Sequence, residues 1–179
     1  EGLVAINWST YQNADGGFKN SIASGSFYGI TFLHELSHAV GLKHPHDKGL
    51  IGQPRFPGLT HRSNEFRDKG DFDQNAQPFT QLTYVDKGAR NGMVPESIEA
   101  YGFLQTPGAL DIAALQWMYG INPDAASGDD TYTLPLENRE GTGWRAIWDT
   151  GGVDRITAAG ATAPVTIDLR NATLGDDVN

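Results

Sequence analysis

The hydrophobic and polar positions of the chain indicate two helices and several short strands. Leu3–Tyr11 is apolar and rich in β-prone residues, which predicts a strand. From residue 27 to residue 42 apolar side chains recur at helical spacing, so we expect a helix that Ser26 caps and Gly41 ends. The predicted buried face of this helix consists of Phe32, Leu33, Leu36, Ala39 and Val40.

A second helix is predicted in the segment TPGALDIAALQWMYG, residues 106–120. Thr106 is expected to cap it, Pro107 suits its first turn, and Asp111 lies near the positive end of the helix dipole. Gly120 is expected to end it. The predicted buried stripe consists of Leu110, Ala114, Trp117 and Met118.

The remaining segments are of two kinds. Residues 44–81 are polar and contain four prolines, which predicts a long irregular segment with a functional role. After Asn122 the β-like runs TYTLPL, WRAIWD, DRITAAG and APVTIDL alternate with turns rich in Gly, Asp and Asn. This change predicts one domain at residues 1–121 and the beginning of a second at residues 122–179.

Composition excludes several classes of function. The chain has 179 residues, a formal net charge of −9 and no cysteine. The acidic excess argues against a nucleic-acid partner and suits a cation such as Ca²⁺, while the lack of cysteine excludes thiolate metal sites. No apolar run approaches the roughly 20 residues that span a bilayer. Since residue 1 is not Met, we expect that it is not the natural start of the protein.

The segment HELSHAVGLKHP, residues 34–45, contains three of the five histidines. His34 and His38 are four residues apart, so on a helix they project from one face and can bind one ion together. Glu35 points partly away from that ion and can meet a water molecule beside it, which is the role of the general base in H-E-x-x-H. His44 can join the pair only if the chain turns sharply, and Gly41 permits that turn.

Three neutral imidazoles can hold Zn²⁺ and leave a fourth position open, which is typical of a catalytic site. The undiminished charge of the ion lowers the pKa of bound water to about 7 and polarises a substrate carbonyl. Glu35 then takes the proton of the water and passes it to the leaving amine. The alternative is a chance pairing of His and Glu on a helix, against which Gly41 and His44 argue by their spacing. We expect His46 and His61, which show no such spacing, to be solvated.

The pattern H-E-x-x-H-x-x-G-x-x-H, followed by Pro45, resembles the serralysin branch of the metzincin metalloproteases. FTQLTYVD (Phe79–Asp86) is similar to the Met-turn of that family, GALDIAALQWMYGIN to the helix after it, and IWDTGGVDRI to the start of the calcium-binding β-roll. The resemblance covers about residues 27–170. It implies an α+β metzincin-type catalytic domain with an incomplete N-terminal sheet, an active-site helix, a Met-turn-like segment and a C-terminal helix, followed by the start of a β-roll.

The resemblance also implies roles for individual residues. Zinc ligation falls on His34, His38 and His44, and the role of general base falls on Glu35. Tyr84 matches a family tyrosine that ligates zinc at rest and then swings away to stabilise the oxyanion. The alternative for Tyr84 is a turn tyrosine that packs on the core.

The chain departs from the family pattern at two places. Leu82 stands where the family has methionine, and since such swaps usually cost under about 1.5 kcal/mol, we expect the zinc site to form. Only 33 residues precede His34, so we expect the catalytic domain to be incomplete at its N-terminus. Leu3–Tyr11 is then the edge strand that pairs with extended substrate, or a neighbour of that strand.

A calcium site is implied where the family joins its two domains. Oxygen ligands that include two carboxylates suit Ca²⁺, whereas the alternative is an ordinary acidic turn. Complete G-G-x-G-x-D repeats are absent from the sequence. The implied ligands are Asp149, Gly151 and Asp154 of DTGGVD, and the carbonyl oxygens of Ala126, Gly128 and Asp130.

The sequence therefore predicts a zinc endopeptidase with Zn²⁺ and Ca²⁺ as cofactors and proteins or peptides as substrates. Secretion is implied by the resemblance alone. A proteinaceous inhibitor or a missing N-terminal segment is the other candidate partner, and we expect no nucleic acid and no membrane span. Two alternatives remain open: a zinc-binding pseudoprotease with impaired catalysis, and a calcium-dependent structural or adhesion module with a vestigial histidine motif.

Overall fold

The computed structural model describes residues 5, 7, 9, 12, 14–15, 23–47, 56–59, 66–85, 102–136, 142–162 and 164–175. Within these residues two helices precede two short strands: α1 (Phe27–Ala39), α2 (Ala109–Tyr119), β1 (Thr131–Thr133) and β2 (Arg155–Thr157). This composition is consistent with the α+β class. The predicted strand Leu3–Tyr11 lies largely outside the described residues, and residues 5, 7 and 9 within it form no strand.

The ends of α1 follow the sequence prediction. The Ser26 hydroxyl accepts a hydrogen bond from the Gly29 N–H at 2.9 Å and so satisfies one donor of the first turn. At the other end, Gly41 has a φ of +98°. Because glycine adopts this conformation without a steric cost, the chain can leave the helix axis there.

The buried side of α1 differs from the predicted face. Ile30 and Ser37 are the buried residues of the helix, because the segments that pack on α1 contact this side. The apolar spacing therefore predicts the helix but does not identify the side that its neighbours cover. The predicted face divides into three exposed residues, Phe32, Leu36 and Val40, and two half-buried ones, Leu33 and Ala39.

The start of α2 lies later than predicted. Gly108 is the residue before the helix, and Thr106 does not cap it. The Thr106 hydroxyl instead donates toward the carbonyl oxygens of Pro107 and Ala146, at 3.1 and 3.2 Å. Thr106 and Pro107 therefore lie outside α2, whereas Gly120 ends the helix as predicted.

The predicted buried stripe of α2 is correct only in the first part of the helix. Leu110 is buried and Ala114 is half-buried, but Trp117 is 67% exposed and Met118 is 37% exposed. Residues 79–81 bond to Leu110 and Asp111 at the start of α2, whereas the large side chains of its last turn are exposed. The prediction for Trp117 and Met118 was therefore wrong.

A small apolar cluster joins α1 to two later segments of the chain. Ile30, Phe103 and Leu104 are buried together, and Leu33 and Trp144 pack against them. Leu104 and Trp144 form an isolated parallel bridge, and the Trp144 N–H donates to the Phe103 carbonyl at 3.2 Å. These contacts hold the inner side of α1 in place.

The two strands form a parallel pair in which Thr131 lies opposite Arg155 and Thr133 opposite Thr157. Parallel neighbours cannot be joined by a tight hairpin turn and need a crossover connection. Strands were predicted in four runs, and TYTLPL and DRITAAG are confirmed in part. WRAIWD contributes only the bridge of Trp144, and residues 164–169 of APVTIDL form no strand.

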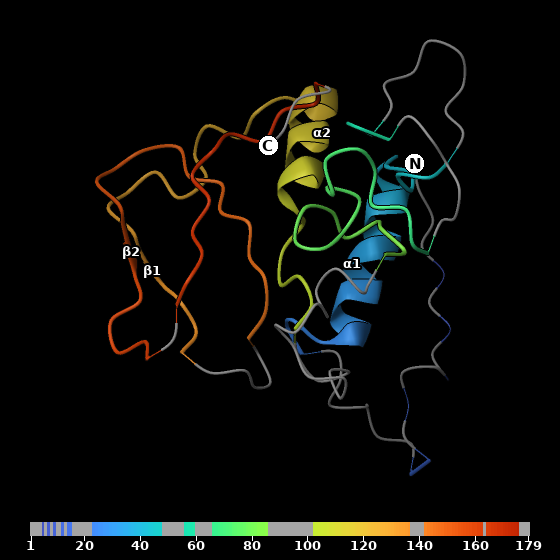
Figure 1. Cartoon of the computed structure of the whole chain (residues 1–179), viewed down its shortest axis with the longest axis horizontal. Coiled ribbons are helices and arrows are strands. Elements are labelled where there is room, and N and C mark those ends of the chain that lie inside the picture. Colours follow the sequence, from blue (N-terminus) through green and yellow to red (C-terminus); the bar gives the residue numbers. More distant parts are fainter. Residues whose placement is uncertain are drawn as a thin grey trace.

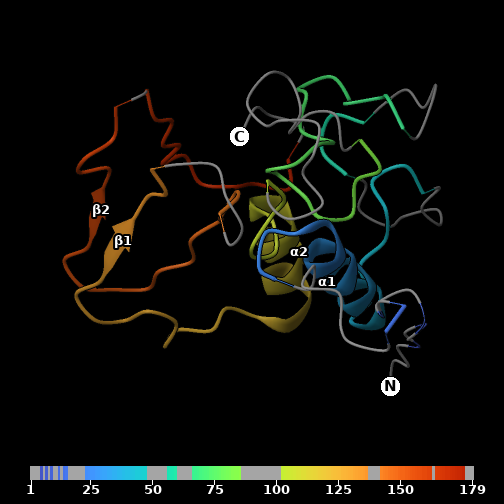
Figure 2. The same cartoon turned by 90° about the horizontal axis from the view of Figure 1, so that it is seen from below.

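The elements lie in a row, with α2 between α1 and the strand pair (Figures 1 and 2). The segment of residues 66–85, green in Figure 1, lies against the helices. Neither helix of the described residues has the length and apolar character that crossing a membrane requires.

Candidate metal centre

The three predicted zinc ligands converge on one point. The Nε2 atom of His44 lies 3.1 Å from the Nε2 atom of His34 and 3.1 Å from that of His38. In a tetrahedral site with Zn–N bonds of about 2.0–2.1 Å, two ligand nitrogens lie about 3.3–3.4 Å apart. The spacing of the imidazoles therefore fits a single Zn²⁺ ion, and all three side chains are half-buried.

The other ring nitrogen of each histidine has an acceptor as its partner. Nδ1 of His34 donates to the Gln81 carbonyl at 2.9 Å, and Nδ1 of His38 donates to the Leu42 carbonyl at 2.9 Å. Nδ1 of His44 lies 3.1 Å from a carboxylate oxygen of Asp47. Since none of these oxygens can donate, the Nδ1 atoms carry the protons, which is the usual outer arrangement of metal-binding histidines.

This choice of tautomer has a direct consequence for the triad. In the neutral imidazoles the Nε2 atoms that face one another hold lone pairs rather than protons, and three lone pairs at this distance repel unless a cation lies between them. Burial lowers the pKa of His34 and of His44, which favours the neutral, metal-binding form. The donor set and its geometry therefore fit zinc.

The turn after α1 brings His44 back toward the helix. The Leu42 N–H donates to the Ser37 carbonyl at 3.0 Å, which closes the turn around Gly41. The Tyr119 hydroxyl, from the end of α2, donates to the Val40 carbonyl at 2.6 Å and ties the second helix to the same turn. Gly41 thus has the role that the sequence predicted for it.

The Met-turn-like segment lies directly beneath α1. Besides accepting from His34, Gln81 uses its side-chain amide to donate to the Leu33 carbonyl at 3.2 Å and to the Ser37 hydroxyl. Leu82, which replaces the family methionine, is 2% exposed. Of the predicted segment Phe79–Asp86, residue 86 lies outside the described residues. The segment is thus fixed to the helix by Gln81, a residue that the sequence analysis did not single out.

Asp111 holds this segment from the side of α2. It is buried, and its carboxylate accepts hydrogen bonds from the Thr80 hydroxyl at 2.6 Å, the Gln81 N–H at 2.8 Å and the Gly108 N–H at 2.9 Å. The backbone of Gln81 is therefore held at both ends, by Asp111 at its N–H and by His34 at its carbonyl. Asp111 is a structural support of the metal centre as well as a residue of the first turn of α2.

Asp111 predicts a specific dependence of stability on pH. Burial raises its pKa from 3.8 to about 6, although the three hydrogen bonds favour ionisation. Between these pH values Asp111 keeps a proton in the folded chain that it releases in the unfolded chain. The contribution of Asp111 to the free energy of unfolding is therefore fully present below about pH 4 and is lost as pH rises through about 6. The expected loss is on the order of 3 kcal/mol. Unfolding free energies across that range should fall more steeply for the unaltered chain than for Asp111→Asn, and equal slopes would contradict the assignment.

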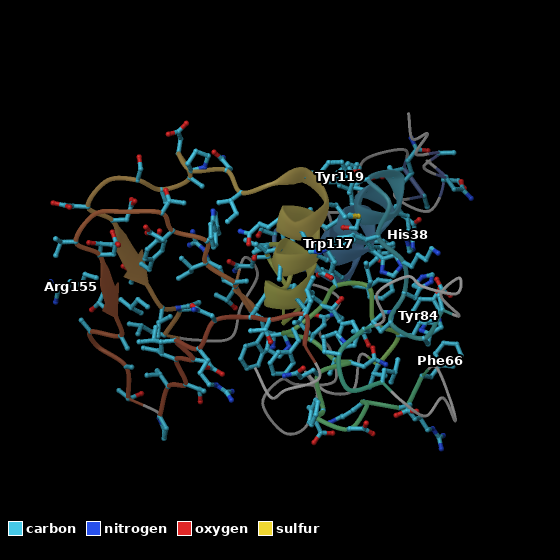
Figure 3. The ribbon with its side chains drawn as sticks, turned by 90° about the horizontal axis from the view of Figure 1, so that it is seen from above. His38, Phe66, Tyr84, Trp117, Tyr119 and Arg155 are labelled. Carbon is cyan, nitrogen blue, oxygen red and sulfur yellow. The ribbon has the colours of Figure 1, made fainter. Side chains whose placement is uncertain are left out.

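Tyr84 lies beside the histidines, as the resemblance implies. Its ring centroid is 4.6 Å from that of His44 and 6.0 Å from that of His34, and the side chain is 37% exposed. Tyr84, His38 and Phe66 gather on the side of the molecule opposite the strand pair (Figure 3). An exposed phenol at this position can reach a substrate, which a tyrosine buried in the core could not do.

Two further residues belong to the surroundings of the site. His46 was expected to be solvated, but it is half-buried, stacks on His44 with ring centroids 4.8 Å apart, and lies 4.6 Å from the Tyr84 ring. That prediction was wrong because the turn after Pro45 folds His46 back onto the site. Asp47 was missed, although its place three residues after His44 suits a turn residue that bonds back to the chain. His61 lies outside the described residues.

Glu35 is exposed on α1 next to His34. Its negative charge acts on the imidazole of His34 and favours the protonated ring, an effect that burial outweighs when it lowers the pKa of His34. Exposure leaves the carboxylate accessible to water and substrate. This placement is compatible with the role of a general base. Among the described interactions, none holds the Glu35 carboxylate away from the histidines.

The acidic segments after α2 also come together. Carboxylate oxygens of Asp130, Asp149 and Asp154 lie within 4.8 Å of one another. The side chain of Asp130 takes part, whereas the sequence analysis assigned only its carbonyl, which here accepts from the Arg155 N–H at 2.8 Å. Gly152 has a φ of +111°, and a side chain there would collide with the Gly128 carbonyl. The close approach of the two backbones thus requires glycine.

The other predicted oxygen ligands lie in the same two segments. Ala126 has a positive φ of +50°, so the backbone curls at this point, and the Thr150 N–H donates to the carbonyl of the preceding Ala125 at 3.1 Å. The Gly151 N–H donates to a carboxylate oxygen of Asp149, two residues earlier in the chain, at 3.1 Å. Segments 123–130 and 149–155 therefore pack side by side around the acidic cluster.

The chain is similar in sequence to several metalloproteases of the serralysin kind. The chain is 27% identical over 161 residues to serralysin from Proteus mirabilis, a match that covers 85% of this chain and 30% of that protein. It is 27% identical over 157 residues to metallopeptidase AprA from Pseudomonas marginalis, covering 82% of this chain and 30% of the relative. For serralysin G from Dickeya chrysanthemi the identity is 25% over 181 residues, covering 94% and 33%.

The chain thus spans about a third of the length of the curated relatives that it matches. No family model matches the chain, and no solved structure matches it. The similarity covers most of this chain and therefore is not limited to the histidine motif.

Proposed function

We propose that the chain is a zinc endopeptidase of the serralysin kind, with a metzincin-type catalytic domain in residues 1–121. One observation carries the proposal: three imidazole Nε2 atoms converge while all three Nδ1 atoms are engaged with acceptors. This arrangement leaves three lone pairs for one cation. Similarity to metalloproteases over most of the chain supports the same assignment.

His34, His38 and His44 would hold the zinc ion, which when bound acts as a Lewis acid on water and on the substrate carbonyl. Glu35 accepts the proton that the attacking water loses and later delivers it to the leaving amine. The phenol of Tyr84 donates a hydrogen bond to the carbonyl oxygen as negative charge develops on it. Asp47 and Gln81 keep the histidine rings oriented, so the donor atoms need not reorganise during the reaction.

Chelation tests this function. A fluorogenic peptide should be cleaved by the zinc-loaded chain, lose cleavage after treatment with a zinc chelator, and regain it when stoichiometric zinc is returned. A chain that folds, binds zinc and cleaves no peptide would instead be the pseudoprotease of the sequence analysis. Leu82 is the residue to examine in that case, through the variant Leu82→Met.

We further propose that residues 122–179 begin a β-roll whose junction binds Ca²⁺ through Asp130, Asp149 and Asp154. Three carboxylates together are costly without a cation, since like charges close to one another repel. Backbone oxygens of the packed segments can complete an oxygen coordination shell, which Ca²⁺ prefers. Ala126, Gly128 and Gly151 lie in those segments. The names metallopeptidase and metalloprotease among the relatives support cleavage of peptide bonds, and the resemblance to serralysins makes secretion part of the proposal.

Calcium should therefore stabilise the chain. At a free concentration about 100 times its dissociation constant, a single bound ion adds about 2.7 kcal/mol to the free energy of unfolding. Asp149→Asn should abolish most of this gain, whereas Asp124→Asn, which is exposed and outside the cluster, should retain it. Differential scanning calorimetry with and without calcium measures the effect. A different result would favour the structural module over the protease. In that result calcium stabilises the chain, the chain contains no zinc, and a zinc chelator does not change its stability.

A further inference from the structure

A second group of metal-binding side chains adjoins the histidine triad. Ring nitrogens of His44 and His46 and a carboxylate oxygen of Asp47 lie within 4.8 Å of one another. We propose that His46 and Asp47 form a second, weaker site for a divalent transition-metal ion, which fills after the triad and inhibits the enzyme. The proposal that a second ion binds depends only on these residues. The proposal that this ion inhibits the enzyme rests on the proposed function.

His44 separates the two sites and is not itself available to the second ion. Its Nε2 atom faces His34 and His38, and its Nδ1 atom donates to Oδ2 of Asp47 at 3.1 Å. The same Oδ2 accepts the backbone N–H of His44, also at 3.1 Å. The second ion is therefore assigned to Oδ1 of Asp47 and a ring nitrogen of His46, with water completing its coordination.

The chemistry of this pair selects the kind of ion. One imidazole and one carboxylate suit Zn²⁺, Ni²⁺ and especially Cu²⁺, whereas Ca²⁺ and Mg²⁺ prefer sites built of oxygen alone. Two protein ligands bind more weakly than the three of the triad.

Occupation of the second site should disturb the first. Asp47 is the acceptor that orients His44, and an ion on its other oxygen withdraws negative charge from that hydrogen bond. Loss of such an outer partner typically lowers metal affinity or activity about 10- to 100-fold. The second ion also lies on the side of His46 and Tyr84, whose rings are 4.6 Å apart, and so beside the phenol that faces substrate. Excess zinc would thus limit the activity of the zinc enzyme.

Equilibrium dialysis against rising free zinc tests the binding directly. The chain is kept in saturating calcium so that the acidic cluster is occupied. The unaltered chain should bind two zinc ions in two steps, and His46→Asn should bind one, with the first step unchanged as evidence that the variant folds. Lys43→Ala, an exposed neighbour, should keep both steps.

Three results would overturn the second site: a single zinc ion in the unaltered chain, two ions that persist in His46→Asn, or no zinc at all. The last result would also remove the proposed function, whereas the first two leave it intact. Peptide hydrolysis supplies a separate readout. The zinc concentration that halves the rate should rise at least about tenfold in His46→Asn, because the second ion then loses one of its two protein ligands; tenfold corresponds to about 1.4 kcal/mol of binding free energy. Equal inhibition of both chains would overturn the inhibitory role.

Discussion

Replacing Glu35 by glutamine is expected to lower kcat/KM for peptide hydrolysis by about 10²–10⁴-fold while one zinc ion stays bound to each chain. Glutamine has nearly the shape of glutamate but cannot accept the proton that the attacking water loses. Glu35 is exposed on α1 and makes no contact on which the fold depends among the described residues, so the variant should fold as the unaltered chain does. The loss should therefore appear in catalysis alone.

The measurement pairs steady-state kinetics with the zinc content of the same samples. His34 lies next to Glu35, so zinc retention shows that the substitution has not disturbed the neighbouring ligand. Activity within a factor of a few of the unaltered chain would exclude Glu35 as the base. A parallel loss of zinc and activity would mean that Glu35 supports the ligands rather than the chemistry.

Replacing Tyr84 by phenylalanine is expected to lower kcat by about 10²–10³-fold with little change in KM, the usual cost of removing one donor to a developing oxyanion. The variant keeps the aromatic ring, whose contacts with His44, His46 and Phe66 have centroid distances of 4.6, 4.6 and 5.5 Å. Only the hydroxyl is lost. A tyrosine that merely packs in the turn would tolerate this change.

Tyr132→Phe is the matched control for Tyr84→Phe. The Tyr132 hydroxyl donates to Asp149 at 2.6 Å, so it belongs to the acidic cluster and not to the histidine site. Its removal should leave kcat unchanged. Equal kcat in the Tyr84→Phe variant and the unaltered chain would remove Tyr84 from the mechanism and return it to the packing role considered in the sequence analysis.

The sequence predicts the local part of the site because helix geometry settles it. His34 and His38 meet through their spacing of four residues, and Gly41 supplies the turn that returns His44. These features depend on residues close together in the chain. The prediction of helix caps is less reliable, as Thr106 shows. Its hydroxyl donates to the carbonyl of Ala146, and a local sequence pattern cannot reveal a partner so distant in the chain.

The supports of the site could not be predicted because they depend on packing between distant segments. Gln81 is a polar residue in a turn by its sequence, yet it is buried and bonds to Leu33 and Ser37 of α1. Asp111 was placed correctly near the start of α2, but nothing local indicates that it holds the turn beneath the histidines. The buried face of α1 and the exposure of Trp117 were misassigned for the same reason.

The zinc content of the unaltered chain and of His44→Ala, measured after dialysis against a weak chelator, shows whether the three histidines form a metal site. His44 is the ligand to choose because the other two lie on one helix turn and would pair in many helices by chance, whereas His44 joins them only in this fold. We expect one tightly held zinc ion per unaltered chain and none in the variant. An unaltered chain without zinc, or a variant that holds zinc as tightly, would mean that the three histidines do not form a zinc site.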